Sequence, residues 1–200
     1  MSDESPTSGD AAADDDRAAD DDAAAEDEKP TNDGQRFDRL PATAADRVVP
    51  GRASREEVVD WWETRFGVDP AVFDGYSFWE KGAGKIWIYN GEAPDPTHIE
   101  AVGMTILRTR QEHWKPTTRG AARFGRHATS NVVVLDPAEA TTFAAGEDQE
   151  LPRWDGDWGY LIAAHEIAGE VEPIGVGLYL HGELRSRIPK GSREELGTLE

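Results

Sequence analysis

The sequence predicts an α+β protein in which a small, mostly antiparallel and partly open β-barrel with short helices follows a small α/β segment and an acidic tail. Three observations support this class. The length of 200 residues suits one domain with a small appendage. Beyond residue 76, many short apolar segments are separated by Gly and Pro, which is typical of β-strands. Cap residues mark only a few short helices, so strands should dominate the folded part.

Residues 1–35 form a low-complexity acidic tail that we expect to be disordered. They contain 13 Asp and Glu against two Lys and Arg, and Met1 is their only aliphatic or aromatic residue larger than Ala. Such a segment cannot bury enough apolar surface to offset the entropy lost on folding. A lead-in punctuated by Arg and Pro follows over 36–53, and residues 193–200 are expected to form a second, short tail.

A small α/β segment is predicted over residues 54–95. Ser54 and Glu57 form a capping box, an apolar stripe with two adjacent Trp follows, and Gly67 ends the helix. We expect these Trp side chains to lie in the core rather than to stack on a ligand. The two hairpin strands and the linker expected after this helix are 77–82, 85–90 and 92–98.

The barrel is predicted over residues 99–192. Its longer helix has Asp136 as N-cap, Pro137 in the first turn and Gly146 at its end. His181-Gly182 suits a tight turn between the last two strands. The expected strands are 99–107, 131–135, 159–165, 173–180 and 183–188, with a short helix over about 117–124.

The residues that the chain lacks exclude several classes of protein. The absence of Cys excludes a disulfide scaffold, a Cys-based zinc site and a cysteine nucleophile. No apolar run approaches 18 residues, and the acidic start is not a signal peptide, so we expect no membrane association and a cytoplasmic location. Neither a cofactor nor catalysis is expected. No metal site is expected either, because metal-ligand spacing is missing among His98, His113, His127, His165 and His181.

The charge composition is typical of a halophilic, archaeal protein. Asp and Glu number 40 against 21 Lys and Arg, and Arg outnumbers Lys 16 to 5. In concentrated salt, carboxylates keep a surface hydrated, so the net charge would reflect the solvent rather than the partner. The informative feature is therefore where the positive charge lies.

Two basic islands stand out against this acidic background. Between Ala101 and Leu135 the only acidic residue is Glu112. The first basic island there consists of Arg108, Arg110, Lys115, Arg119, Arg123 and Arg126. The second basic island consists of Arg185, Arg187, Lys190 and Arg193. Both fit a phosphate-binding surface on which His113 and Trp114 stack against bases. The alternative is that these cations pair with the abundant carboxylates.

Around these islands the sequence resembles a known module. The resemblance covers about residues 99–192 and is to the PUA-like RNA-binding domain at the C-terminus of RsmF-type ribosomal RNA cytosine-5 methyltransferases, with archaeal relatives. The small segment over 54–92 also resembles the one that precedes archaeal PUA-type domains. The motifs that carry the resemblance are Leu107-Arg108-Thr109, Lys115-Pro116-Thr117, Leu135-Asp136 leading to Gly146-Glu147, Pro173-Ile174-Gly175-Val176-Gly177 and Gly182-Glu183-Leu184-Arg185-Ser186-Arg187-Ile188-Pro189-Lys190.

The resemblance implies a non-enzymatic module that binds structured ribosomal or transfer RNA. The parent enzymes use a cysteine thiolate and an S-adenosylmethionine domain, and this chain has no Cys and no Gly-rich strand–helix fingerprint. Two roles stay open: delivery of RNA to a separately encoded RNA-modifying enzyme, and assistance in ribosome assembly. The RNA-binding residues that we expect are Arg108, Arg110, His113, Trp114, Lys115, Arg119, Arg185, Arg187 and Lys190.

Two other functions compete with RNA binding. In the first, the protein is an interaction adaptor whose barrel no longer binds RNA: the face of Gly175 and Gly177 docks a partner, and carboxylates from residues 10–28 cover the basic islands. In the second, the protein is an enzyme with a cleft lined by Glu112, His113 or His127, for which the sequence offers little support. The loop at 154–158, WDGDW, is interpreted as a solvated turn, with cation or partner binding as the alternative.

Overall fold

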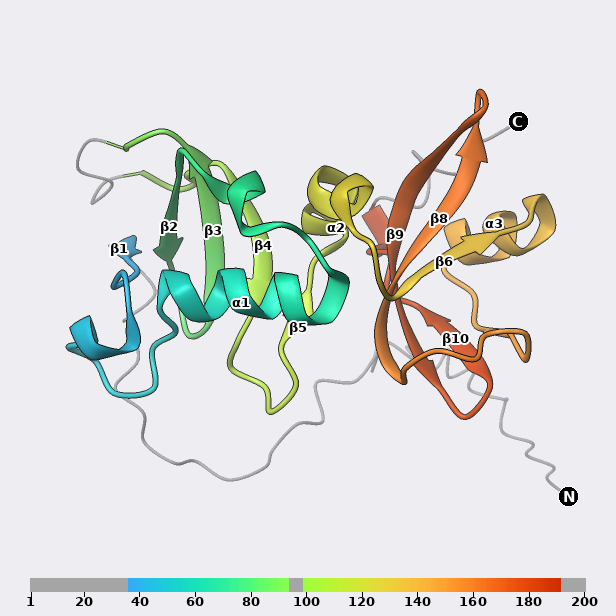
Figure 1. Ribbon diagram of the computed structural model, residues 1–200, viewed down its shortest axis with the longest axis horizontal. Helices are drawn as coiled ribbons and strands as arrows, with labels where there is room; N and C mark the ends of the chain where they lie inside the picture. The colour runs from blue at the N-terminus through green and yellow to red at the C-terminus, as the bar shows by residue number, and fades with distance from the viewer. Residues whose placement is uncertain (1–35, 94–98, 192–200) are drawn as a thin grey trace, which may run out of the picture.

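The computed structural model describes residues 36–93 and 99–191 (Figure 1). These residues form an α+β fold with two five-stranded sheets and three α-helices. The predicted disorder of residues 1–35 and the predicted tail at 193–200 lie outside the described residues. Among the residues described, no helix is long and apolar enough to cross a membrane.

The first sheet is antiparallel throughout and has the strand order β1-β2-β3-β4-β5. The predicted hairpin of β2 and β3 is confirmed. The strand predicted over 99–107 begins only at Met104, because Gly103 has a φ of 59° and lies against the Ile88 carbonyl. The strands are β1 (Asp38–Arg39), β2 (Tyr76–Glu80), β3 (Lys85–Asn90), β4 (Met104–Arg108) and β5 (Lys115–Pro116).

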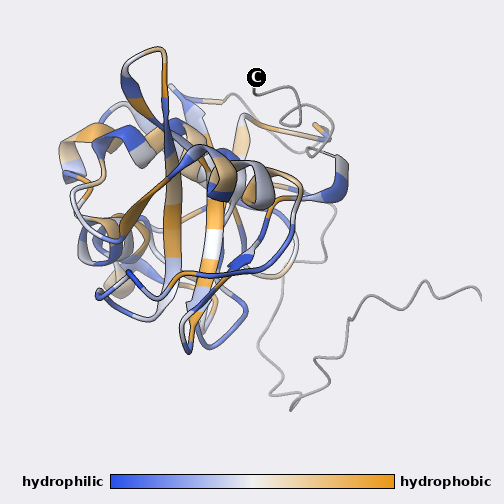
Figure 2. Cartoon of the chain, turned by 90° about the vertical axis from the view of Figure 1, so that its right-hand side faces the viewer, coloured by the Kyte–Doolittle hydropathy of each residue, from blue (hydrophilic) through white to orange (hydrophobic). Residues whose placement is uncertain are grey.

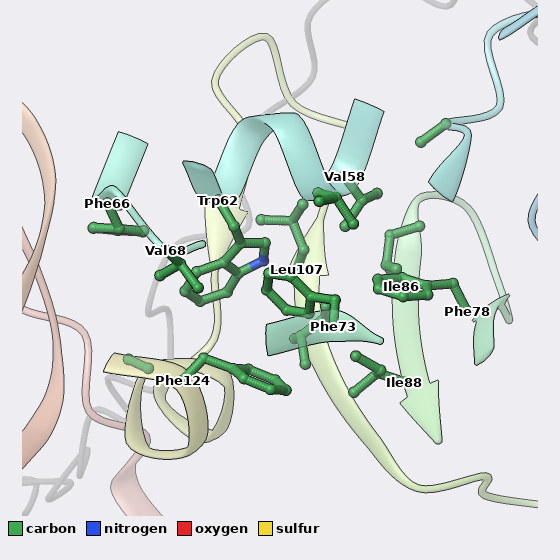
Figure 3. Packing of buried hydrophobic residues seen from close by; sticks show 14 of the residues in the cluster. Val58, Trp62, Phe66, Val68, Phe73, Phe78, Ile86, Ile88, Leu107 and Phe124 are labelled. Atoms are coloured by element: carbon green, nitrogen blue, oxygen red, sulfur yellow. The ribbon is translucent and has the colours of Figure 1, made fainter. Parts of the chain in front are cut away.

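Helix α1 (Arg55–Phe66) covers one face of this sheet and begins and ends where the sequence predicts. The Ser54 hydroxyl accepts a hydrogen bond from the Glu57 N–H, and the Glu57 carboxylate accepts one from the Ser54 N–H. Gly67 ends the helix in the left-handed conformation, with φ of 63°. Figure 3 shows Trp62 at the centre of the apolar core below the helix, so its predicted core position is confirmed.

The second sheet has the strand order β6-β8-β9-β10-β7. All its pairs are antiparallel except β6–β8, a parallel pair that the sequence did not indicate. Helix α3 (Pro137–Ala144) has the predicted N-cap, since the Asp136 carboxylate accepts from the N–H groups of Ala138 and Glu139. The strands are β6 (Val132–Leu135), β7 (Gln149–Glu150), β8 (Gly159–Ile167), β9 (Glu170–Leu180) and β10 (Glu183–Ser186).

The strand face that carries Gly175 and Gly177 is covered by the chain itself. A Cβ atom added to either glycine would lie within 3.2 Å of the Phe143 ring of α3. The close approach that two alternating glycines predict is therefore made by a helix of the same chain. The adaptor hypothesis was wrong to place a partner on this face.

Helix α2 (Thr118–Phe124) lies between the two sheets (Figure 1). Gly120 packs against the Ile106 carbonyl of β4, and Gly125, directly after the helix, packs against Pro173 of β9. Ile162 of β8 belongs to the same buried cluster as the side chains of α1 and the first sheet. In Figure 2, which faces the second sheet, the strands in the middle of the view carry hydrophobic segments and the loops at its lower edge are largely hydrophilic.

The division between sheets does not coincide with the predicted division of the sequence at 95–99. Strand β4 pairs with β3, and β5 pairs with β4, so both complete the first sheet. The transition from one sheet to the other falls between α2 and β6. The first basic island therefore lies on or next to the first sheet and α2, and the described residues of the second lie on or just after β10 of the second sheet.

Candidate functional site

The two basic islands meet where β5 approaches the end of β10. Lys115 of β5 lies directly opposite Arg108 of β4. The pKa of Lys115 is lowered by burial first, and then by the positive charges of Arg187 and Arg108. Arg187 follows β10 directly, so a residue of the second island shares a site with two residues of the first. We call Arg108, Lys115 and Arg187 the junction cluster.

The segment that carries Lys115 is held against the first sheet, and the segment that carries Arg187 is held against the second. Pro116, the residue after Lys115, is buried and lies opposite Leu107 of β4. The Arg187 N–H donates to the Val176 carbonyl of β9 at 3.0 Å. Its neighbours Ser186 and Ile188 are both buried. Since successive side chains of an extended segment point to opposite sides, the exposed Arg187 side chain points away from the core.

No carboxylate balances the junction cluster among residues 36–93 and 99–191. None of the ion pairs between described residues includes Arg108, Lys115 or Arg187. Like charges that lie close together, one of them half-buried, raise the free energy of the folded state, and a bound anion would lower it. The junction cluster is therefore a candidate binding site for an anion.

The alternative prediction, that cations of the islands pair with carboxylates, is confirmed for two residues outside the junction cluster. Arg126 forms an ion pair with Glu172 at 3.2 Å, and Arg185 pairs with Glu183 at 2.6 Å. Arg123 donates instead to the Tyr76 hydroxyl at 3.0 Å. The described cations of the two islands are therefore of two kinds. Some form ion pairs or hydrogen bonds within the protein, and the others lie near one another without a carboxylate partner among the described residues.

The other predicted binding residues are near the cluster in the sequence and differ in exposure. His113 precedes β5 and is exposed, whereas the neighbouring Trp114 is half-buried with its ring 6.5 Å from that of Trp61. Trp114 therefore contributes to the core, and base stacking on it stays a prediction. Of the second island, Arg193 lies outside the described residues. The remaining predicted residues are all exposed: Arg110, Arg119 and Lys190.

Tyr160 of β8 is a neighbour of the junction cluster that sequence analysis missed. Burial raises the pKa of its hydroxyl, and the positive charge of Arg187 opposes this rise. The neutral phenol supplies a hydrogen-bond donor beside Arg187. Nothing in the sequence around Tyr160 marks it, because its position beside Arg187 depends on the pairing of β8, β9 and β10.

The described residues give less support to other kinds of site, such as a metal site or a small-ligand pocket that includes the predicted binding residues. Among the residues that the structure describes, no three His, Asp or Glu side chains group so as to hold a metal ion. The His165 Nδ1 lies 2.9 Å from the Leu135 carbonyl oxygen. A recess of about 570 Å³ beside α3 is lined by residues that include His165, Glu166 and Arg153, but by none of the predicted binding residues.

Two comparisons with known proteins bear on this chain. Residues 23–103 match the model of a family of unknown function (DUF7122). Over 157 residues, the chain is 24% identical to the ribosomal RNA small subunit methyltransferase F of Aeromonas salmonicida (strain A449). The match covers 77% of this chain and 29% of that enzyme, so the chain spans less than a third of the length of the curated relative that it matches.

Proposed function

We propose that the protein is a non-enzymatic RNA-binding module of PUA-like fold that recognises structured ribosomal or transfer RNA. The observation that carries the proposal is the junction cluster, in which three cations without a described carboxylate partner come together from two sheets. RNA presents a dense row of phosphates, and positively charged grooves that follow such a row are a common basis of RNA binding.

The similarity to a methyltransferase named for ribosomal RNA supports an RNA-related role. The motifs around residues 103–125 and 172–191 contain all three members of the junction cluster. These motifs carry the resemblance to the PUA-like domain of the RsmF-type enzymes. We infer that the chain corresponds to the RNA-targeting part of such an enzyme and acts without its chemistry.

The geometry suggests how a phosphate would bind. Arg108 and Lys115 lie side by side on β4 and β5, and Arg187 approaches from the second sheet. A phosphate between them would neutralise their mutual repulsion, and two guanidinium groups can each donate paired hydrogen bonds to its oxygens. Such bidentate contacts rely less on bulk charge, which suits an acidic protein working in the concentrated salt that its composition suggests.

The proposal is tested by ultraviolet crosslinking in living cells, followed by recovery of the protein and sequencing of the attached RNA. Cells keep the native salt concentration, which strongly affects affinity for RNA. We expect a sharp crosslink site on one ribosomal or transfer RNA, and its loss in the Arg108→Ala/Arg187→Ala double variant. The matched control is Arg126→Ala, which removes an exposed arginine that is paired with Glu172.

The identity of the crosslinked RNA would also distinguish the two cellular roles. A crosslink beside a modified nucleotide supports delivery of RNA to a separately encoded modifying enzyme. A crosslink at a site of ribosomal protein attachment supports a role in assembly. Absence of RNA above background, with a protein recovered instead, would contradict RNA binding and favour the adaptor.

A further inference from the structure

Trp158 and His181 form an exposed aromatic pair at the end of the second sheet. The Trp158 residue is 59% exposed, and His181 is exposed as well. Their ring centroids are 4.6 Å apart and their planes meet at 67°, which is an edge-to-face arrangement. The indole therefore has its neighbour at one side and is accessible from solvent over much of its surface.

The structure fixes the backbone on both sides of this pair. The Arg65 guanidinium donates to the Trp158 carbonyl at 3.0 Å and to the Tyr160 carbonyl at 2.8 Å. His181 occupies the β9–β10 turn with φ of 53°. By contrast, Trp154, in the same loop as Trp158, packs against the core of the second sheet. One indole of this loop thus stabilises the fold, and the other is held at the surface.

Tyr160 connects the aromatic pair to the junction cluster. It follows Trp158 by two residues, near the start of β8. Tyr160 lies opposite Leu178, and Leu178 lies opposite Arg185. Directly opposite residues of antiparallel strands point to the same face. The positive charge of Arg187 acts on the Tyr160 hydroxyl, so a residue two positions from Trp158 is a neighbour of the cluster.

The charges next to the aromatic pair disfavour an anionic group on the indole. Asp157 precedes Trp158 and pairs with Arg65 at 3.6 Å, while Glu183 follows the β9–β10 turn and pairs with Arg185. These carboxylates are occupied by arginines, yet they would still repel a phosphate placed on the indole. A nucleobase is flat and uncharged, and its π-face suits an exposed aromatic ring.

We propose that Trp158 and His181 form a binding site for an unpaired nucleobase, with the base stacked on the indole and a phosphate of the same RNA strand at the junction cluster. This inference rests on the proposed RNA-binding function and adds a specificity to it: the protein requires a nucleotide that is free to leave its helix. A fully paired duplex keeps its bases stacked inside and cannot occupy the site.

Fluorescence anisotropy titrations of two labelled RNA probes test this site. The first probe is single-stranded oligoadenylate, and the second is a blunt duplex of oligoadenylate with oligouridylate. We expect Trp158→Ala to weaken binding of the single strand by roughly tenfold, within a range of about 5- to 150-fold, and to leave binding of the duplex unchanged. Trp158→Phe, which keeps an aromatic ring, should retain most of the affinity.

Control variants separate failure of this inference from failure of the proposed function. Tyr89→Ala removes an exposed aromatic residue of the first sheet and should change neither titration. Single-strand binding that is equal in Trp158→Ala and the wild type, yet reduced in Arg108→Ala/Arg187→Ala, would overturn the stacking site alone. Equal weakening of both probes by Trp158→Ala would overturn it too. No binding of either probe by the wild type would overturn the stacking site, and only together with the absence of crosslinked RNA in cells would it refute both proposals.

Discussion

The arginines of the lead-in segment and those of the junction cluster belong to the same acidic chain but are used in opposite ways. Arg52 lies between Asp38 and Glu80, at 2.9 Å and 2.8 Å, with only 12% of its side chain exposed. Lys115 has a lowered pKa because it is half-buried and because Arg187 and Arg108 are near it. In the first region cations and carboxylates satisfy one another, whereas the cations of the second have no carboxylate partner among the described residues.

This difference shows that positive charge in an acidic protein must be judged by its surroundings. A buried ion pair holds two segments in register, and losing one partner leaves an uncompensated charge behind. A cluster of like charges does the reverse, because it weakens the fold and gains favourable energy only when an anion arrives. Variants in the two regions should therefore affect stability and binding separately.

The largest effect is expected from breaking the buried pair in the lead-in. Arg52→Ala would leave the buried Glu80 carboxylate without its cation, so the free energy of unfolding should fall by about 3 kcal/mol. Urea unfolding measures this change. Arg39→Ala, which breaks the exposed pair with Glu92, is the matched control and should change stability little. A comparable loss in both variants would contradict the distinction between buried and exposed pairs.

The junction cluster should respond in the opposite sense. Arg108→Ala/Arg187→Ala removes two of the proposed phosphate contacts, so we expect RNA affinity to fall roughly tenfold or more, while stability stays the same or rises slightly. The slope of log affinity against log salt concentration should become shallower by about two. Titrations at several salt concentrations test both statements. An unfolding free energy reduced as much as in Arg52→Ala would show that these arginines are structural.

Much of the fold could be predicted from local signals. The helix between Ser54 and Gly67 has a capping box at one end and a left-handed glycine at the other, and these signals act within a few residues. The hairpin around Gly82 and the cap at Asp136 are local in the same way. Short-range chemistry of this kind determines where an element begins and ends, and most predicted elements were found.

The pairing of strands that are far apart in the sequence could not be predicted from the sequence. Nothing around Met104 shows that β4 joins the first sheet, and the parallel pairing of β6 with β8 depends on distant contacts. The site was predicted as two islands, whereas their meeting at Lys115 required the positions of both sheets. Tyr160 and the Trp158–His181 pair were missed for the same reason.

A smaller effect is expected at Arg185, where the two kinds of surroundings meet. Arg185 lies on β10, two residues before Arg187, but its guanidinium is held by Glu183. Glu183→Gln would release this guanidinium and remove a negative charge, so RNA affinity should rise roughly twofold to fivefold. Anisotropy titration against the wild type gives the answer. Unchanged affinity would show that Arg185 does not take part in binding.

The smallest effect is a pH dependence of stability that originates at Lys115. Its pKa in the folded protein lies below the ordinary value of 10.5, so between these two values the unfolded chain binds more protons than the folded one. Stability should therefore rise with pH across this interval as the cost of the charged amine disappears. Lys115→Met lacks this amine, so its advantage over the wild type should shrink as the pH rises. A constant difference would contradict the lowered pKa.

The most direct test of the junction cluster is to measure RNA affinity and unfolding free energy together for Lys115→Met. Methionine keeps much of the volume of the lysine stem and removes the half-buried charge that two arginines repel. We predict weaker RNA binding together with an unfolding free energy that rises by less than about 1 kcal/mol. Unchanged affinity would mean that the cluster is not a binding site, and a loss of stability would mean that Lys115 supports the fold.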